Sequence, residues 1–161
     1  MSVVIDQREK PDEYRERAQR VLKGSVDFLP EGDYLICKDG GTTHSRETHM
    51  LVERKTTDNL VSSIVKKKAN GRIELFDQLE RCKLVADRVV LLVEGSLCHD
   101  PHSLKACWTQ KEGKARRRRD VGYTAVQGAL WHVQKELGVV VVWTESYDAT
   151  LTMLEYLDRR K

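Results

Sequence analysis

One short apolar run limits the fold of this chain more than any other feature. Val89-Val90-Leu91-Leu92-Val93 is bounded by charge, with Arg88 before it and Glu94 after it. An uninterrupted apolar run of this length is typical of a strand buried on both faces, in the centre of a sheet that carries helices on both sides. A similar run at residues 139–143 predicts a second strand. The chain is therefore expected to form an α/β domain.

The remaining pattern predicts the element order β-α-β-β-β-α-α-β-α-β-α. Strands are expected at 3–5, 26–29, 33–37, 50–55, 89–93 and 139–143. Helices are expected at 12–23, from Thr56 or Thr57 to 65, and at 73–86, 126–137 and 151–157, where apolar residues recur at helical spacing. Residues 96–120 show no clean period. Because antiparallel strands precede the βαβ crossovers, we predict a mixed sheet with helices on both faces.

Length and composition fit a single domain over residues 1–161. Apolar residues make up 40% of the chain, which is enough for one core. No apolar run approaches the roughly 18 residues of a membrane span, and the first ten residues are too charged for a signal peptide. The four cysteines are widely spaced. These features predict an intracellular protein with no membrane partner, cytoplasmic if prokaryotic or phage-encoded and nuclear if eukaryotic.

Acidic and basic residues gather on two neighbouring predicted strands. Asp33 begins one strand, and Glu53 and Lys55 share a face of the next because side chains alternate along a strand. If the two strands pair as a meander, both carboxylates meet at one edge. Two such carboxylates bind a hard cation, Mg²⁺ or Mn²⁺, and a lysine beside it orients water or stabilises charge on a phosphate. This is the chemistry of phosphodiester hydrolysis.

These residues resemble a known family. Gly32-Asp33-Tyr34, Val52-Glu53-Arg54-Lys55 and Asp58 resemble the GDx(n)ERKx(3)D signature of the nuclease domain of the XPF family, often called the ERCC4 domain. Further segments resemble the family in the same order, namely Ile5-Asp6-Gln7-Arg8-Glu9, Asn70-Gly71-Arg72 with Gln78, and the strand that ends at Glu94.

The resemblance implies a restriction-endonuclease-like core and a metal-dependent nuclease that cuts branched DNA. It assigns metal binding and catalysis to Asp6, Asp33, Glu53 and Lys55, with Lys55 as the catalytic lysine and the three carboxylates as metal ligands. It assigns supporting roles to Arg8, Glu9, Arg54 and Asp58, and DNA contact to Arg72 and Gln78. All motif carboxylates and the motif lysine are present, which argues against a degenerate, inactive family member.

XPF-like enzymes usually carry a tandem helix-hairpin-helix module after the nuclease domain, and this sequence shows no such module. We expect that a partner subunit supplies the extra DNA binding or that a basic run does. That run consists of Lys111, Lys114, Arg116, Arg117, Arg118 and Arg119. Such density of positive charge favours sequence-independent phosphate binding, although a solvated loop or a nuclear-localisation patch has the same composition. Trp108 and Tyr123 flank the run and suit either base stacking or the core.

Three other groups of residues leave alternatives open. Lys66-Lys67-Lys68 forms a second basic patch. Cys98, His99, His102 and Cys107 are chemically able to bind zinc, but their spacing matches no known zinc pattern and the resemblance does not require zinc. The resemblance implies a homodimer, and the C-terminal helices carry more apolar residues than one buried stripe needs, although a well-packed monomer core has the same composition.

The sequence thus predicts a structure-selective endonuclease acting on flaps, forks or four-way junctions in DNA repair or recombination. Two alternatives remain. One is a non-catalytic DNA-binding subunit that targets a partner nuclease, and the other is a nuclease of the same fold that acts on linear DNA.

Overall fold

A mixed six-stranded sheet forms the centre of the protein. The computed structural model describes residues 3–37, 49–100, 105–107 and 121–160. Within these residues the sheet has the order β2-β1-β3-β4-β5-β9, with β1 (Val3–Asp6), β2 (Ser25–Asp27), β3 (Tyr34–Cys37), β4 (His49–Thr56), β5 (Arg88–Glu94) and β9 (Val140–Thr144). β3 is antiparallel to β1 and β4, whereas β2 runs parallel to β1, and β4, β5 and β9 run parallel to one another.

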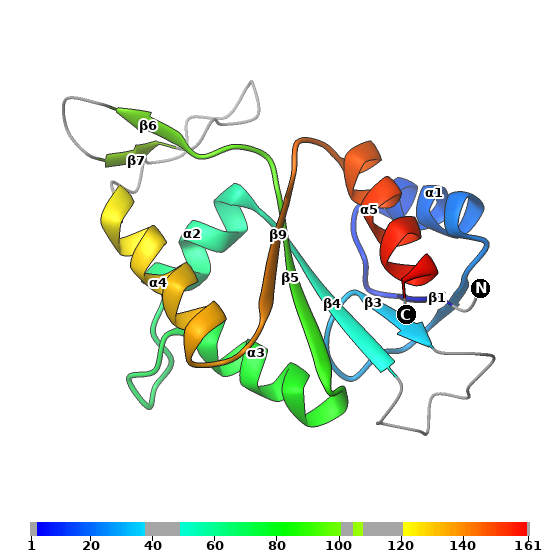
Figure 1. Cartoon of the computed structure of the whole chain (residues 1–161), viewed down its shortest axis with the longest axis horizontal. Coiled ribbons are helices and arrows are strands. Elements are labelled where there is room, and N and C mark those ends of the chain that lie inside the picture. The colour runs from blue at the N-terminus through cyan, green and yellow to red at the C-terminus, as the bar shows by residue number, and fades with distance from the viewer. Residues whose placement is uncertain (1–2, 38–48, 101–104, 108–120, 161) are drawn as a thin grey trace.

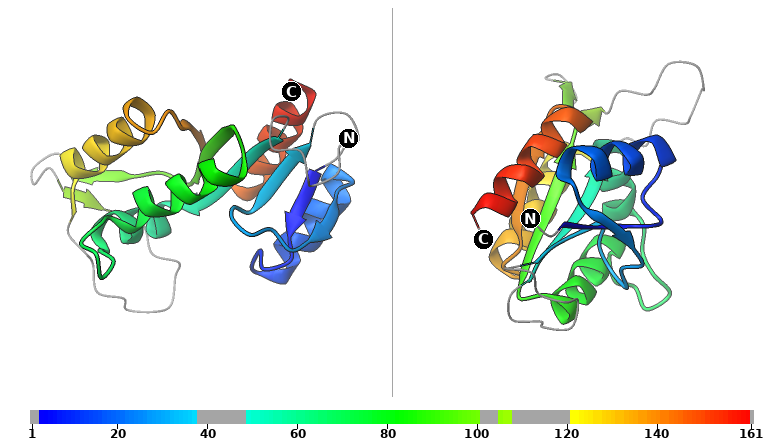
Figure 2. Two further views of the ribbon diagram at one scale, coloured as in Figure 1. Left: turned by 90° about the horizontal axis from the view of Figure 1, so that it is seen from below. Right: turned by 90° about the vertical axis from the view of Figure 1, so that its right-hand side faces the viewer.

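Helices cover both faces of this sheet (Figure 1). In the described part of the chain they are α1 (Asp12–Leu22), α2 (Thr57–Val65), α3 (Glu74–Val85), α4 (Tyr123–Lys135) and α5 (Tyr147–Arg159). α2, α3 and α4 pack on one face, and α1 and α5 pack side by side on the other (Figure 2). The predicted α/β fold with a mixed sheet between two helical layers is confirmed.

The strand β5 has the central position that its sequence predicted. Val89, Leu91 and Val93 face the core under α2, α3 and α4, while Val90 and Leu92 face the core under α1 and α5. The similar run at 139–143 forms β9, but β9 is the edge of the sheet and Val140 is exposed. Composition alone does not separate a central strand from an edge strand, because that difference depends on which strands pair.

The region between β5 and α4 differs from the prediction. A second, three-stranded sheet is made of β6 (Cys98–Asp100), β7 (Lys105–Cys107) and β8 (Val121–Gly122), and it extends beyond α4 (Figure 1). Strands of two or three residues are too short to show an alternating pattern, so no periodicity predicts them. The basic run 111–119 and Trp108 lie outside the described residues.

Local signals account for several element boundaries. Thr56 caps α2 as predicted, and its Oγ1 accepts a hydrogen bond of 3.3 Å from Asn59 N–H. α1 ends one residue earlier than expected, because Lys23 itself takes the left-handed conformation with φ of 49°. Gly24 is needed for another reason, since a Cβ there would lie 2.4 Å from the Val3 carbonyl oxygen. None of the helices in the described ranges is long and apolar enough to cross a membrane.

Candidate active site

Strand β4 directs alternate side chains to opposite faces of the sheet. Glu53 and Lys55 point to the face covered by α2 and α3, as the sequence predicted, and Arg54 points to the face covered by α1 and α5. Asp33 N–H donates to the Val52 carbonyl at 2.9 Å, which extends the β3–β4 register by one residue and sets Asp33 opposite Glu53. The expected meeting of these two carboxylates at one edge follows from this pairing.

Gln78 of α3 joins the catalytic candidates into one hydrogen-bonded group. Lys55 Nζ donates to Glu53 Oε1 at 3.1 Å and to Gln78 Oε1 at 2.8 Å. Gln78 Nε2 in turn donates to the same Glu53 oxygen at 2.7 Å. The amide therefore fixes both the lysine and the carboxylate. The resemblance implied that the helix carrying Gln78 lies near the active site and DNA, and the structure places Gln78 against Glu53 and Lys55 in the candidate site. Contact of Gln78 with DNA stays a prediction.

Burial dominates the electrostatics of Asp33. Desolvation raises the pKa of its carboxyl well above the usual range, and the nearby carboxylates Glu53 and Glu9 raise it further. Two groups oppose this shift, namely the Arg54 backbone N–H, which donates to Asp33 Oδ2 at 2.6 Å, and the charge of Lys55. Buried carboxylates that repel one another in this way are stabilised by a bound cation.

This repulsion predicts a pH-dependent stability. Since the folded state holds the Asp33 proton more tightly than the unfolded state, the free energy of unfolding falls as pH rises from the unfolded pKa through the raised folded pKa. We expect Asp33→Asn to remove that slope and to stabilise the protein at pH 7, by about 1.4 kcal/mol for each tenfold difference in proton affinity between the folded and unfolded states that it removes. Urea denaturation in EDTA between pH 4 and pH 8 measures this. Exposed Asp87→Asn is the control, and equal or lower stability of Asp33→Asn would contradict the prediction.

Asp6 lies in one pocket with Asp33 and Glu53, but its carboxylate is bound by Arg8. The pocket has a volume of about 410 Å³ and includes Asp6, Arg8, Asp33, Glu53 and Gln78 in its lining. Arg8 N–H donates to Asp6 Oδ1 at 2.7 Å, and Arg8 Nε lies 3.0 Å and 3.1 Å from the two Asp6 oxygens. Its Nη2 contacts Asp6 Oδ2 and the Leu29 carbonyl. Both Asp6 oxygens are therefore engaged by Arg8.

Asp33 and Glu53 are the carboxylates best placed to bind a divalent cation. Within the residues that the structure describes, no group of three or more His, Cys, Asp or Glu side chains is placed to hold one metal ion. Mg²⁺ needs no such cage, because it commonly binds one or two carboxylates together with water and substrate phosphates. Asp33 and Glu53 supply hard oxygen donors of this kind, so the site fits Mg²⁺ or Mn²⁺. Direct ligation by Asp6 stays a prediction.

Arg54 is held by a buried polar network on the opposite face of β4. Its Nε donates to Glu9 Oε1 at 2.9 Å and its Nη1 to Glu94 Oε2 at 3.1 Å. The rings of Tyr14 and Tyr147 lie 5.4 Å and 5.2 Å from its guanidinium carbon. Burial opposes the charge, but the two carboxylates raise the pKa of Arg54 above its ordinary value. Glu9 and Arg54, for which supporting roles were expected, thus belong to one ion-pair network directly behind Glu53 and Lys55.

A second pocket of about 450 Å³ adjoins the first and shares Asp33, Glu53 and Gln78 with it. Its lining also contains Asn59, whereas Asp58 lies in the first turn of α2 and belongs to neither lining. The three-residue spacing of the family signature, counted from Lys55, falls on Asn59. The signature's final position was therefore wrongly assigned to Asp58, because Asn59 occupies it and an amide replaces one of the motif carboxylates that the sequence analysis took as present. The supporting role of Asp58 stays a prediction.

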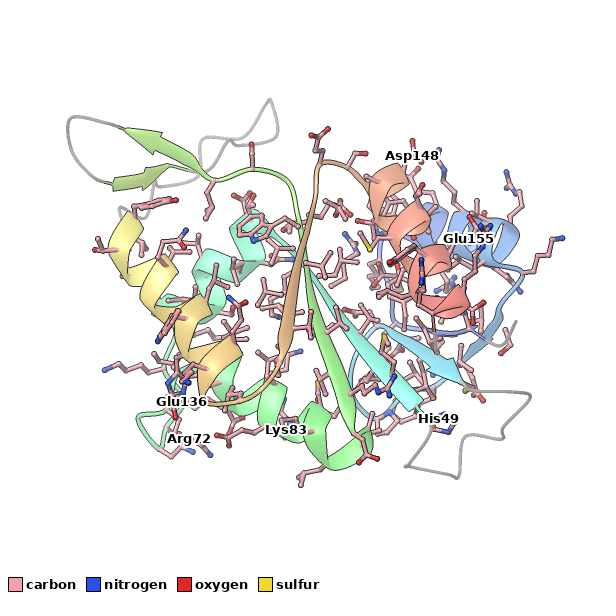
Figure 3. The ribbon with its side chains drawn as sticks, in the orientation of Figure 1. His49, Arg72, Lys83, Glu136, Asp148 and Glu155 are labelled. Atoms are coloured by element: carbon pink, nitrogen blue, oxygen red, sulfur yellow. The ribbon has the colours of Figure 1, made fainter. Side chains whose placement is uncertain are left out.

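Basic residues predicted to contact DNA lie just before α3 and make ion pairs with acidic side chains. Arg72 is exposed and pairs with Glu80, with Asp77 3.9 Å away, at the outer edge of the molecule (Figure 3). In the Lys66–Lys68 patch, Lys66 Nζ lies 2.9 Å from Glu74 and Lys68 Nζ lies 3.1 Å from Asp77. Contact of Arg72 with DNA stays a prediction.

The structure describes the stacking candidate Tyr123, but only part of the candidate zinc-binding group. Tyr123 begins α4 and packs, half-buried, against the core, as one of its two expected roles required. Cys98 and Cys107 are register partners on β6 and β7, and His102 lies outside the described residues. The zinc hypothesis therefore stays open.

Several residues of the site carried no signal in the sequence. Arg81 and Glu31 line the first pocket and are joined by a 2.7 Å contact from Arg81 Nε. Tyr14 and Tyr147 stack with ring centroids 4.0 Å apart although 133 residues separate them. Only the tertiary structure brings such residues together, and no local spacing predicts the contact.

The fold and the carboxylate–lysine group agree with the family that the sequence matches. The ERCC4 domain model matches residues 5–157, so the chain belongs to the ERCC4 domain family. Among solved structures, XPF from Aeropyrum pernix and the same protein in complex with DNA each match with a TM-score of 0.67, at 22% and 24% identity. Each match covers 99% of this chain but 64% of that chain. No curated protein matches the sequence.

Proposed function

We propose that this protein is a divalent-metal-dependent endonuclease that hydrolyses phosphodiester bonds in branched DNA. The observation that carries the proposal is the group of buried Glu53 and Lys55 with half-buried Asp33 and Gln78, at the junction of two adjoining pockets. Membership of the ERCC4 domain family and the similarity to an XPF structure in complex with DNA support it. Flaps, forks and four-way junctions are the proposed substrates, and DNA repair or recombination is the proposed setting.

The chain's own residues supply positioning and charge. Asp33 and Glu53 would hold Mg²⁺ or Mn²⁺, which when bound polarises the phosphate and makes its water more acidic. Glu53 and Gln78 hold the Lys55 ammonium group in the site, from which it donates to the attacking water or to a phosphate oxygen. The Arg54 backbone N–H fixes one oxygen of Asp33. Burial strengthens each of these interactions by excluding water.

The second pocket offers a path for the DNA strand. Lys10, Asn59, Ser62 and Lys66 line it beside Lys55. These side chains supply hydrogen-bond donors and positive charge of the kind that bind phosphate groups without reading sequence. We propose that the basic run 111–119, or a partner subunit, adds further DNA affinity.

Cleavage of end-labelled DNA tests the proposal. Flap, fork, four-way junction and plain duplex substrates are each incubated with Mg²⁺, Mn²⁺ or EDTA. We expect cuts near the branch point with either metal and none in EDTA. Equal cutting of plain duplex would favour a nuclease for linear DNA. Binding of branched DNA without cutting under any metal would favour a targeting subunit.

We further propose that the protein forms a homodimer through the exposed apolar side of α4 and β9. Trp131 is 68% exposed and lines a pocket of about 570 Å³ together with Trp143 and Leu97. Exposed aromatic residues on an edge strand and its neighbouring helix are typical of an interface. We expect Trp131→Glu to halve the molar mass measured by light scattering, while Leu84→Glu on α3 leaves it unchanged. A wild-type monomer at micromolar concentration would rule out this interface.

A further inference from the structure

An exposed aromatic ring stands beside the carboxylate pocket. Phe28 is 54% exposed and follows β2, whose last residue Asp27 is the register partner of Asp6 on β1. The main chain here is well fixed, since Phe28 N–H donates to Asp27 Oδ1 at 2.7 Å and Gln7 N–H donates to the Asp27 carbonyl at 2.9 Å. The ring therefore lies at the same end of the sheet as the candidate active site.

Arg8 covers one face of this ring. The guanidinium carbon of Arg8 is 4.7 Å from the centroid of the Phe28 ring. The same guanidinium is anchored by both oxygens of Asp6 and by the Leu29 carbonyl. Because Arg8 lies over one face of the ring and the residue as a whole is still 54% exposed, a ligand would approach the opposite face.

Arg8 also connects the ring to the site. It lines the same pocket as Asp33 and Glu53, and its side chain is half exposed. An arginine in such a position both supports an aromatic ring and binds phosphate oxygens. The ring and the carboxylates are thus two parts of one surface, joined by Arg8.

We propose that Phe28, supported by Arg8, is a stacking platform for an unpaired nucleobase of the strand being cut. The inference rests on the proposed nuclease function and names the substrate feature that the site selects. A base within a duplex is stacked on both faces, whereas an unpaired base has a free face to place on an aromatic ring. The charged neighbours Arg8 and Asp27 suit a flat ligand with polar edges better than an apolar protein side chain.

Fluorescence of 2-aminopurine tests this platform independently of cleavage. The full chain is titrated, in EDTA, with a flap DNA that carries 2-aminopurine at single unpaired positions next to the branch, and with plain duplex. We expect stacking to quench one of these positions in the wild type. We expect Phe28→Ala to abolish that quenching and to weaken flap binding about tenfold, with less than a twofold change for duplex. Because the ring is exposed, its removal spares the core.

Matched variants separate stacking from other effects. Phe28→Trp keeps an aromatic face and is expected to retain quenching, whereas Phe28→Leu keeps the bulk and is expected to lose it. Tyr156 on α5 is the control, because the residue is 52% exposed and the Arg160 guanidinium carbon lies 5.5 Å from its ring centroid. Tyr156→Ala is expected to bind flap DNA like the wild type.

The outcomes for the platform and for the nuclease are distinct. Unchanged flap binding and quenching in Phe28→Ala, or equal losses for flap and duplex, overturn the platform even if the wild type cuts DNA normally. Loss of quenching in Phe28→Ala, in a protein that cuts no DNA with any metal, supports the platform and overturns only the nuclease.

Discussion

Replacing Lys55 with alanine is expected to lower the rate of DNA cleavage by a factor of about a thousand. The ammonium group is held in the site by Glu53 Oε1 at 3.1 Å and Gln78 Oε1 at 2.8 Å, and alanine removes it altogether. Removing one preorganised donor from a buried catalytic site costs roughly 10²- to 10³-fold in rate. Single-turnover cleavage of flap DNA with saturating Mg²⁺ measures the effect.

Two further variants show whether the effect belongs to the site. Gln78→Ala removes the group that orients Lys55 but leaves the ammonium, and we expect a smaller loss, about tenfold. Lys135→Ala, in an exposed position near the end of α4, is expected to leave the rate unchanged. Cleavage by Lys55→Ala within tenfold of the wild type would remove Lys55 from the mechanism.

Arg54→Ala is expected to give the largest loss of stability in the protein, about 3–5 kcal/mol in the free energy of unfolding. The substitution leaves Glu9 and Glu94 buried without the cation that both contact, at 2.9 Å and 3.1 Å. It also removes the guanidinium beside the rings of Tyr14 and Tyr147. Urea denaturation at pH 7 in EDTA measures the change.

A combined variant distinguishes the unpaired charges from lost packing. In Arg54→Met with Glu9→Gln and Glu94→Gln, no buried charge is left without a partner, so we expect most of the stability to return. Arg159→Ala removes an exposed pair with Glu155 and serves as the surface control, with little change expected. If the combined variant is as unstable as Arg54→Ala, packing and not charge explains the loss.

The sequence predicted the layers of the fold and the centre of the site because both depend on local periodicity. The period of two in β4 places Glu53 and Lys55 together, and the apolar run of β5 marks the centre of the sheet. The predicted pairing of two consecutive strands added Asp33, which the β3–β4 register sets opposite Glu53. These features need no knowledge of distant contacts.

The rest of the site depends on contacts between segments far apart in the chain. Tyr147 reaches Arg54 only because α5 packs beside α1, and the Arg8 side chain meets the Leu29 carbonyl only because β2 lies beside β1. Asp6 shows the same limit, since its motif position predicted a metal ligand but not its engagement by Arg8. Residue type and spacing indicate chemistry, whereas partners are fixed by packing.

The alternation along β4 also determines which kinds of mutation the protein tolerates. Glu53 and Lys55 face the candidate active site, whereas Arg54 between them faces the interior network on the other side of the sheet. Inserting or deleting one residue before this segment would turn Arg54 into the open pocket and bury Glu53 and Lys55 among tyrosines. A substitution in β4 can therefore impair activity or stability separately. An insertion or deletion that shifts the strand register by one residue impairs both at once. Length changes in evolution or engineering should accordingly be confined to the connections on either side of it.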